Sequence, residues 1–586
     1  MGKLQFTTRI LHRRLCYIAA ALGVQLCLLL FLSYRPDTFR DIWPSRPEPQ
    51  KTRPTVRQRP WTVHSTGQSL CADRGRLPKS WELAPIAESG ERGALVFPEM
   101  TGMRWAQQDE LVIEAATVCA WLVVVDWGDG LVEAPYYTNG TDMSSLPEPI
   151  PLWPPDSVEI RAIGKHFTVP VHMDNSHVVV KGSGRHSVDY RVYNVVLDLK
   201  DQDTFTLDVV LEYTDYLWNY EKPAHVFWAP TPLPIYVDRK SLRYIPALVF
   251  TTSPQTHPAV NHEVYTSLPP CTTGNNPGRW VPVPFLKPTT SLNLTSELSS
   301  PNAPDLVMES YTSYTYLPYT CRYVPKTYPD FRKDCLEPHH PFVHLFGDSN
   351  VRRAVKAIGT DGAWCKTWFD EESSNCQCTD WHLGIEGLDP GRPDNSLHLP
   401  TQGPHTDVSS WLYVFLWKGL NDWGPNWKEA LSLEHQPSAI PNYDQIPKKT
   451  PTSVVISLTN WDAAYGSYAS YVASIPTLID LLKTTYAQRN IPIIWRPGQY
   501  FGGRADTTEG DSRRRFSRLR VMAFNTVMEK ALVDAFGAKV WDVYSIGESL
   551  DVGAREKAVT CPSGHAGRDI VDMENVVFMN MLCPIV

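Results

Sequence analysis

The chain has no dense cluster of basic residues and no spacing typical of a metal site. Lys and Arg number 55 against 63 Asp and Glu, so the net charge is −8, whereas a nucleic-acid partner requires a positive surface. Cys376 and Cys378 are separated by one residue rather than two, and no His-rich tract completes a zinc-finger pattern. We therefore expect no nucleic-acid partner, no metal and no bound cofactor.

Long apolar runs are also scarce, and only one is long enough to cross a bilayer. It extends from Leu15 to Tyr34, with Gln25 and Ser33 as its clearly polar residues. Basic residues precede it and no small-x-small cleavage site follows, which favours a signal anchor over a cleaved signal peptide. The sequence thus predicts a cytosolic tail at 1–14 and a membrane helix at 15–34, in a single-pass type II protein of the Golgi or another secretory membrane.

Cysteines and glycosylation sequons fit that compartment. Cys16 and Cys27 lie in or beside the apolar run, which leaves ten of the twelve cysteines, an even number that suits disulfides in an oxidising lumen. Asn139 and Asn293 each begin an Asn-x-Thr sequon. We therefore expect a lumenal glycoprotein with disulfide bonds, whose pairing the spacing does not reveal.

The length of the chain, 586 residues, exceeds what one hydrophobic core can hold, so several domains are expected. Residues 35–83 are rich in proline and lack periodicity, as in a stem. Short β-rich runs recur over 84–250, which predicts an antiparallel, immunoglobulin-like β-sandwich that binds glycans or acts as a spacer. Residues 251–335 indicate a disulfide-pinned connector.

The C-terminal region, 336–586, alternates strand-like and helix-like segments. Strand patterns occur at 342–346, 411–417, 453–458, 491–495 and 539–544, with helical patterns at 471–488 and 513–536 between them. This alternation predicts an α/β fold with a parallel sheet and helices on both faces. Because ligands bind beyond the carboxyl ends of parallel strands, the polar residues after each strand are the candidate site.

The first of these strands ends at Gly347-Asp348-Ser349, and a helical pattern begins directly after it. Gly347 allows a tight turn, and the arrangement carries the Ser349 hydroxyl to the edge of the sheet. Backbone N–H groups at the start of the helix can there meet a developing oxyanion. Strand, turn, serine and helix together predict a nucleophile.

This block, continued by Asn350-Val-Arg-Arg, resembles the first motif of the SGNH (GDSL-type) hydrolases. The continuation resembles their PC-esterase branch, which includes trichome-birefringence-like polysaccharide acetyltransferases and neurexophilin and PC-esterase domain proteins. The resemblance covers about 336–586 and implies an SGNH-like sheet in that region. It also implies that Ser349 is the nucleophile and His565 its general base.

The sequence departs from the family where the acid of the triad is expected. An Asp-x-x-His motif would need aspartate at position 562, which is Pro562. The histidine then lacks the carboxylate that fixes its tautomer. Asp542, after the last strand, could substitute, and Asp551 and Asp569 are weaker alternatives, while a Ser-His pair without an acid is a further one.

The family's oxyanion hole implies three donors, namely the serine N–H, a glycine N–H and an asparagine side chain. Gly419 fits the glycine. Asn460 follows the third-block strand and is preferred over Asn421, which matches the Gly-x-Asn-Asp pattern one strand early. Arg496, at the end of another strand, either binds a substrate carboxylate or sugar hydroxyl or forms a structural salt bridge.

The histidine segment is flanked by Cys561 and Cys583, and a disulfide between these two cysteines would hold it in place. The leading hypothesis is a lumenal O-acyltransferase or esterase, most simply for acetyl, that acts on a glycan or polysaccharide through an acyl-serine. A donor such as acetyl-CoA and a partner that transports it are implied, because one membrane span offers no import route. The alternative is an inactive glycan-binding or scaffolding protein; a glycosyltransferase is disfavoured because no Asp-x-Asp is placed as its metal motif would be.

Overall fold

The structure is a computed structural model, and the residues that it describes belong to the unit Pro60–Val586. They are 61–63, 77, 79–88, 93–96, 111–113, 117–126, 154–164, 166–182, 188–201, 203–213, 249–251, 262–286, 290–294, 306–310, 313–359, 362, 397–400, 410–415, 419–420, 427–431, 450–466, 468–500, 518–550 and 566–584.

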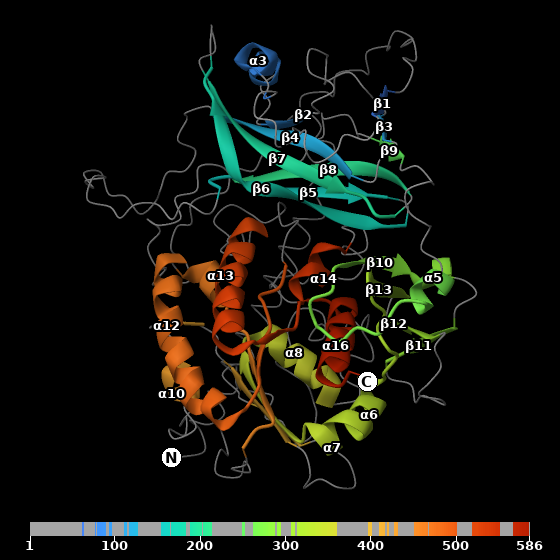
Figure 1. Ribbon diagram of the computed structural model, residues 1–586, viewed down its shortest axis with the longest axis vertical. Helices are drawn as coiled ribbons and strands as arrows, with labels where there is room; N and C mark the ends of the chain where they lie inside the picture. The colour runs from blue at the N-terminus through green and yellow to red at the C-terminus, as the bar shows by residue number, and fades with distance from the viewer. Residues whose placement is uncertain are drawn as a thin grey trace, which may run out of the picture. The chain divides into compact units, whose positions relative to one another are not determined.

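The first half of the described chain forms one curled sheet, drawn in blue to green in Figure 1. Its strands are β1 (Trp61–Val63), β2 (Gly93–Val96), β3 (Leu111–Ile113), β4 (Thr117–Asp126), β5 (Ser157–Ile163), β6 (Thr168–Val180), β7 (Asp189–Asp198), β8 (Thr204–Tyr213) and β9 (Val249–Thr251). They are hydrogen-bonded in the order β1-β3-β9-β8-β5-β6-β7-β4-β2. β6 joins the two halves, because residues 168–171 pair with β5 and residues 172–173 and 177–180 pair with β7.

Alternating side chains of this sheet enter two cores, as the two-residue period of a strand requires. Trp121 and Val123 of β4 pack with Leu83 and Ile86 of α3 (Ser80–Glu88). Their neighbours on the strand, of which Leu122 is one, enter a second core with residues of the following connector. β4 therefore buries apolar residues on both of its faces.

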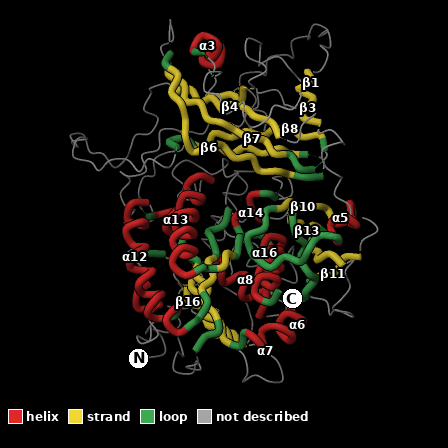
Figure 2. The backbone as a smooth tube through the Cα atoms, in the orientation of Figure 1, coloured by secondary structure: helices red, strands yellow, loops and turns green. Residues whose placement is uncertain are grey.

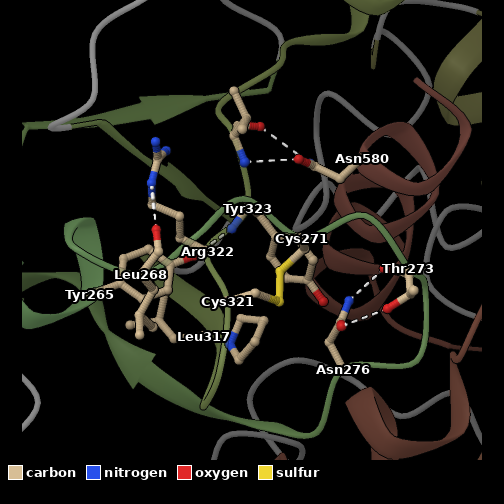
Figure 3. Close-up of a disulfide and its surroundings, with 12 residues drawn as sticks. Tyr265, Leu268, Cys271, Thr273, Asn276, Leu317, Cys321, Arg322, Tyr323 and Asn580 are labelled. Carbon is tan, nitrogen blue, oxygen red and sulfur yellow. Dashed lines mark hydrogen bonds between the residues drawn. A yellow bond between two sulfur atoms is a disulfide. The ribbon is translucent and has the colours of Figure 1, made fainter. Parts of the chain in front are cut away.

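The connector and the first residues after it contain short elements, and a disulfide links two of the connector's segments. These are α5 (His262–Thr266), β10 (Gly278–Pro282), η6 (Val283–Leu286), β11 (Thr290–Asn293), β12 (Leu306–Glu309), β13 (Tyr314–Pro318), α6 (Tyr328–Phe331), η7 (Arg332–Leu336) and α7 (Glu337–His339). Cys271 and Cys321 form the disulfide, and Tyr323 N–H donates to the Tyr265 hydroxyl beside it at 2.9 Å (Figure 3). Asn580 reaches the same region from the C-terminal helix, where its Oδ1 accepts from Val324 N–H at 2.8 Å.

The second sheet belongs to the C-terminal region and has the order β15-β16-β14-β17-β18-β19. Its strands are β14 (Phe342–Gly347), β15 (Leu397–Pro400), β16 (Ser410–Phe415), β17 (Ser453–Ile456), β18 (Ile493–Trp495) and β19 (Lys539–Val540). All pairs are parallel except β15 with β16, which is antiparallel.

Helices cover both faces of this sheet (Figure 2). They are α8 (Ser349–Gly359), α10 (Trp427–Leu431), α11 (Asn460–Tyr465), α12 (Tyr468–Thr485), η10 (Ala487–Arg489), α13 (Arg518–Phe536), α14 (Tyr544–Glu548) and α16 (Arg568–Leu582). Val343 and Val455 share a core with α8 and α16, whereas Phe346, Ile456 and Trp495 share one with α12 and α13. α16 is buried along its whole length, which makes it the central helix of its face.

The fold class predicted from the sequence is wrong. In place of a two-sheet sandwich, the described residues form one curled sheet, because β6 continues the ladder from β5 to β7. The second sheet is mixed rather than purely parallel, and β1 lies inside the segment predicted to be a stem. Within the described ranges, no helix is long and apolar enough to cross a membrane, and the segment from Leu15 to Tyr34 lies outside those ranges.

The disulfide suggested for Cys583 is also wrong. Cys583 follows α16 and is bonded to Cys335 in η7 rather than to Cys561, which lies outside the described residues. The reason is packing: α16 and α6 share one core, with Phe331 against Phe578 at 6.2 Å between ring centroids, so the end of α16 meets η7. Cys119 is disulfide-bonded as well.

Candidate functional site

Ser349 begins α8 directly after β14 and Asp348, and it is half-buried. Gly347 ends the strand at a point of close approach, where a Cβ would meet Val351 Cγ2 at 2.5 Å and Ser457 Cβ at 3.1 Å. A larger residue there would displace Val351 of α8 or Ser457, which follows β17. The sequence Gly347-Asp348-Ser349 thus sets the serine at the first turn of a helix, at the carboxyl edge of the sheet.

Asp348 links the starts of two helices. Its Oδ1 accepts from Asn350 N–H at 2.9 Å, and its Oδ2 accepts from the Asn460 side-chain amide at 2.6 Å. Burial raises the pKa of Asp348, while the charge of Arg496 and these hydrogen bonds act to lower it. The carboxyl therefore fixes the α8 start against the α11 start, immediately behind Ser349.

Asn460, the preferred oxyanion donor, is engaged on both sides. While its amide nitrogen donates to Asp348, its Oδ1 accepts from Gln499 N–H at 3.0 Å. The side chain therefore joins the segments that follow β14, β17 and β18. A primary amide carries two N–H hydrogens, so one donor can serve Asp348 and one can serve an oxyanion.

Arg496 is fully buried and forms an ion pair with Glu574 of α16, with Nη2 at 2.8 Å from Oε2. Gln499 Nε2 donates to the other carboxylate oxygen, and the guanidinium lies over the Trp541 ring at 5.1 Å. Burial raises the pKa of Glu574; the Arg496 charge and these hydrogen bonds oppose the rise, and the charge of Asp348 adds to it. Arg496 thus has the structural salt bridge that was its alternative role.

This buried cluster combines two carboxyl groups with one guanidinium. Within the described ranges, Nε and Nη1 of Arg496 and Oε1 of Gln499 have no hydrogen-bond partner. Because unpaired buried charge is costly, the raised pKa values of Asp348 and Glu574 favour retention of a proton by the pair. The site can therefore hold a proton behind Ser349, while the Arg496 charge stays buried against Glu574.

Gly419 lies at a turn whose backbone is bonded to the side chain of Asp462, a residue of α11. Gly419 has φ +59°, and a Cβ there would overlap the Asp462 carboxyl group. Both Asp462 oxygens accept from Leu420 N–H, at 3.0 and 3.1 Å. Burial raises the pKa of Asp462 well above its usual range. Since Asp462 and Asn460 belong to one short helix, α11 places both predicted oxyanion elements.

Asp542, the predicted substitute acid, caps the start of α14. Its Oδ1 accepts from Ser545 N–H at 3.0 Å, at the start of α14, and its own N–H donates to Gly274 O at 3.1 Å. Burial raises its pKa. In the part of the chain that is described, no hydrogen bond or ion pair links Asp542 to Asp348, Asn460 or Arg496, so the structure does not bring it into the cluster.

Several predicted residues fall outside the described ranges, namely His565, Asn421, Asn139, Cys561 and Asp551. The first described residue after His565 is Ala566, whose N–H donates to Asn350 Oδ1 at 3.1 Å. Asn350 follows Ser349 in α8. Asn293 is the last residue of β11, and Asp569 lies buried in the first turn of α16.

Sequence reasoning assigned no role to Asp348, Asp462, Gln499 or Glu574. Asp348 could have been found, because it stands between the strand and Ser349. Asp462 follows Asn460 by two residues in a block already singled out. Glu574 left only the faint signal of an acid within an apolar helix, and nothing local indicated Gln499.

Among the described side chains, no group of three or more His, Cys, Asp or Glu residues is arranged to hold a metal ion. Comparison of the chain with protein-family models, with curated proteins and with solved structures gives no match.

Proposed function

We propose that the chain is a serine-dependent O-acyltransferase or esterase of the SGNH/PC-esterase type, acting on carbohydrate hydroxyls, with acetyl as the group transferred. The observation that carries the proposal is the hydrogen bond from Ala566 N–H to Asn350 Oδ1. It joins the residue after Ser349 to the residue after His565. A nucleophile and a base need such proximity, because free serine is a poor nucleophile.

In the proposed reaction, Ser349 Oγ attacks the carbonyl carbon of the acyl donor while His565 takes the serine proton. Ser349 N–H, Gly419 N–H and the second amide hydrogen of Asn460 stabilise the tetrahedral oxyanion. His565 then protonates the leaving group, which leaves an acyl-serine. A sugar hydroxyl or water, deprotonated by the same histidine, releases the acyl group, and exclusion of water decides between transfer and hydrolysis.

The proposal includes a glycan or polysaccharide acceptor, a donor such as acetyl-CoA, and a transporter that supplies it. It also includes a location in the secretory pathway. The disulfides Cys271–Cys321 and Cys335–Cys583 support that location, because such bonds persist in oxidising compartments.

The test is active-site labelling with a fluorophosphonate probe. We expect the wild-type chain to be labelled at Ser349, and Ser349→Ala and His565→Ala to lose labelling. Ser474→Ala, on the surface of α12, is the matched control and should label normally. Labelling that survives Ser349→Ala, or a folded wild-type chain that never labels, would exclude the proposal.

A second candidate function is glycan binding without catalysis. It is favoured by Asn460, whose nitrogen and oxygen both have protein partners, and by Pro562 in place of the triad acid. Glycan-array binding that is unchanged in Ser349→Ala, together with the absence of labelling, would select this candidate.

A further inference from the structure

A strand of the curled sheet contacts the segment that contains Arg496 and Gln499 of the candidate site. Arg161 of β5 donates from Nη2 to the hydroxyl of Tyr500, and its guanidinium lies over the Tyr500 ring at 5.1 Å. Arg161 is fully buried and also forms an ion pair with Glu159. This contact joins residues that are 339 positions apart in the chain.

The contact is part of a periodic pattern along β5. Ser157, Glu159 and Arg161 alternate along the strand, so they share one face, and all three are buried. Ser157 Oγ accepts from Leu519 N–H, in the first turn of α13, at 3.3 Å. The intervening residues of the strand, such as Ile160, enter the sheet's own core. One face of β5 is therefore polar, buried and bonded to the C-terminal region.

Tyr500 is the last residue of the segment 496–500, which contributes Arg496 and Gln499 to the buried cluster. Within that segment, Gln499 N–H donates to Asn460 Oδ1 and Gly498 N–H donates to Asn525 Oδ1, at 3.0 and 2.7 Å. The backbone is tightly confined, because a Cβ on Gly498 would lie 2.6 Å from Asn460 Oδ1. The segment that ends at Tyr500 is therefore in direct contact with the Asn460 side chain.

We propose that Arg161 is a positioning residue of the site: through Tyr500 it holds the Gly498–Gln499 segment, and through that segment it orients Asn460. The curled sheet is then part of the catalytic apparatus, in place of the spacer or glycan module considered from sequence. The effect of Arg161 on the reaction rate rests on the proposed function, whereas its effect on the order of the Gly498–Gln499 segment does not.

The experiment compares full-length Arg161→Met with Arg191→Met. Arg191 is the matched control, because it is also a buried arginine of the curled sheet, and its ion-pair partners Asp126 and Asp156 belong to that half of the chain. Hydrogen exchange of the peptide that contains residues 496–500 is measured, together with the rate of fluorophosphonate labelling. Thermal unfolding records the general destabilisation that both substitutions cause.

We expect Arg161→Met to accelerate exchange at Gly498 and Gln499 and to slow labelling by about tenfold or more, since small displacements of catalytic groups are costly. Arg191→Met should change neither. Tyr500→Phe keeps the ring under the guanidinium and should show a smaller effect, and adding it to Arg161→Met should cost little more, because both remove one interaction.

Unchanged exchange at 498–499 in Arg161→Met, or equal acceleration in Arg191→Met, overturns the inference. Faster exchange in Arg161→Met alone supports it. If the wild-type chain is not labelled, the proposed function fails, but the exchange comparison still decides whether β5 holds this segment.

Discussion

At the scale of single residues, Gly419 and Gly537 form a natural comparison. Both have positive φ, +59° and +61°, but a Cβ on Gly419 overlaps the Asp462 carboxyl whereas nothing lies within 4 Å of one on Gly537. We expect Gly537→Ala to cost about 1 kcal/mol of unfolding free energy, from backbone strain alone. Gly419→Ala should cost roughly 1–3 kcal/mol more, from overpacking.

Denaturant unfolding of the two variants measures this difference. Equal losses of unfolding free energy in the two variants would show that the Asp462 carboxyl moves aside. The turn at Gly419 would then be less rigid than its contacts indicate. Labelling of Ser349 should fall in Gly419→Ala but not in Gly537→Ala, because only the first turn carries a proposed oxyanion donor.

The Arg496–Glu574 pair is the residue-scale feature with the largest predicted effect on stability. Both side chains are fully buried, so Glu574→Leu leaves a guanidinium without its counter-charge. Breaking a buried pair from one side costs about 3–5 kcal/mol. The double variant Arg496→Met/Glu574→Leu should be less destabilised than Glu574→Leu alone. Additive losses in a denaturant series would contradict this coupling.

Sequence reasoning could reach Ser349 but not the residues that support it. Ser349 is marked by neighbours in the chain, since an apolar strand, a glycine and a helix surround it. Glu574 meets Arg496 across 78 positions, and Asp462 meets Leu420 across 42. Such contacts depend on which helix covers which strand, and no local pattern contains that information. Asp542, predicted from its position after a strand, caps α14, and its predicted partner His565 lies outside the described residues.

At the scale of elements, α13 contains a predicted pH dependence. Burial, and then the charge of Asp542, raise the pKa of Glu529 from 4.5 to about 7. The folded chain therefore holds this proton more tightly than the unfolded chain does. The contribution of Glu529 to the stability of the folded chain is present below pH 4.5 and is lost as pH rises from about 4.5 to about 7. Glu529→Gln should remove this part of the decline.

Thermal unfolding at several pH values between 4.5 and 7 tests the α13 prediction. A decline of the same slope in Glu529→Gln would assign the pH dependence to other groups, among which the buried carboxyls of Asp348 and Glu574 also have raised pKa values.

Element positions in the C-terminal region were well marked in the sequence, whereas strand pairing in the first half was not. β14, β16 and β17 coincide with largely apolar runs of the sequence, and β14 and β17 are buried, as is typical of strands covered on both faces. The runs over 84–250 also became strands, but their period does not specify how many sheets they form. That outcome depends on β6, whose thirteen residues pair with a different neighbour at each end.

At the scale of the whole molecule, one core crosses the boundary expected near residue 336. Trp280 and Tyr316 of the connector pack with Trp541 and Met573 of the C-terminal region, and Trp280 Nε1 donates to Ile546 O at 2.7 Å. A fragment of residues 336–586 would expose this surface. We expect it not to unfold cooperatively, whereas residues 60–586 should. Calorimetry of the two fragments makes the comparison, and a cooperative transition in the shorter one would refute the shared core.

The bond between Cys335 and Cys583 has a consequence for biosynthesis. It spans 248 positions, and α16 lies just before its second cysteine. At typical elongation rates, Cys335 leaves the ribosome roughly 10–50 s before its partner is made. During that interval β14 lacks its covering helix and Arg496 lacks Glu574. Nascent chains stalled ahead of α16 should therefore keep a reactive Cys335 thiol and depend on chaperones.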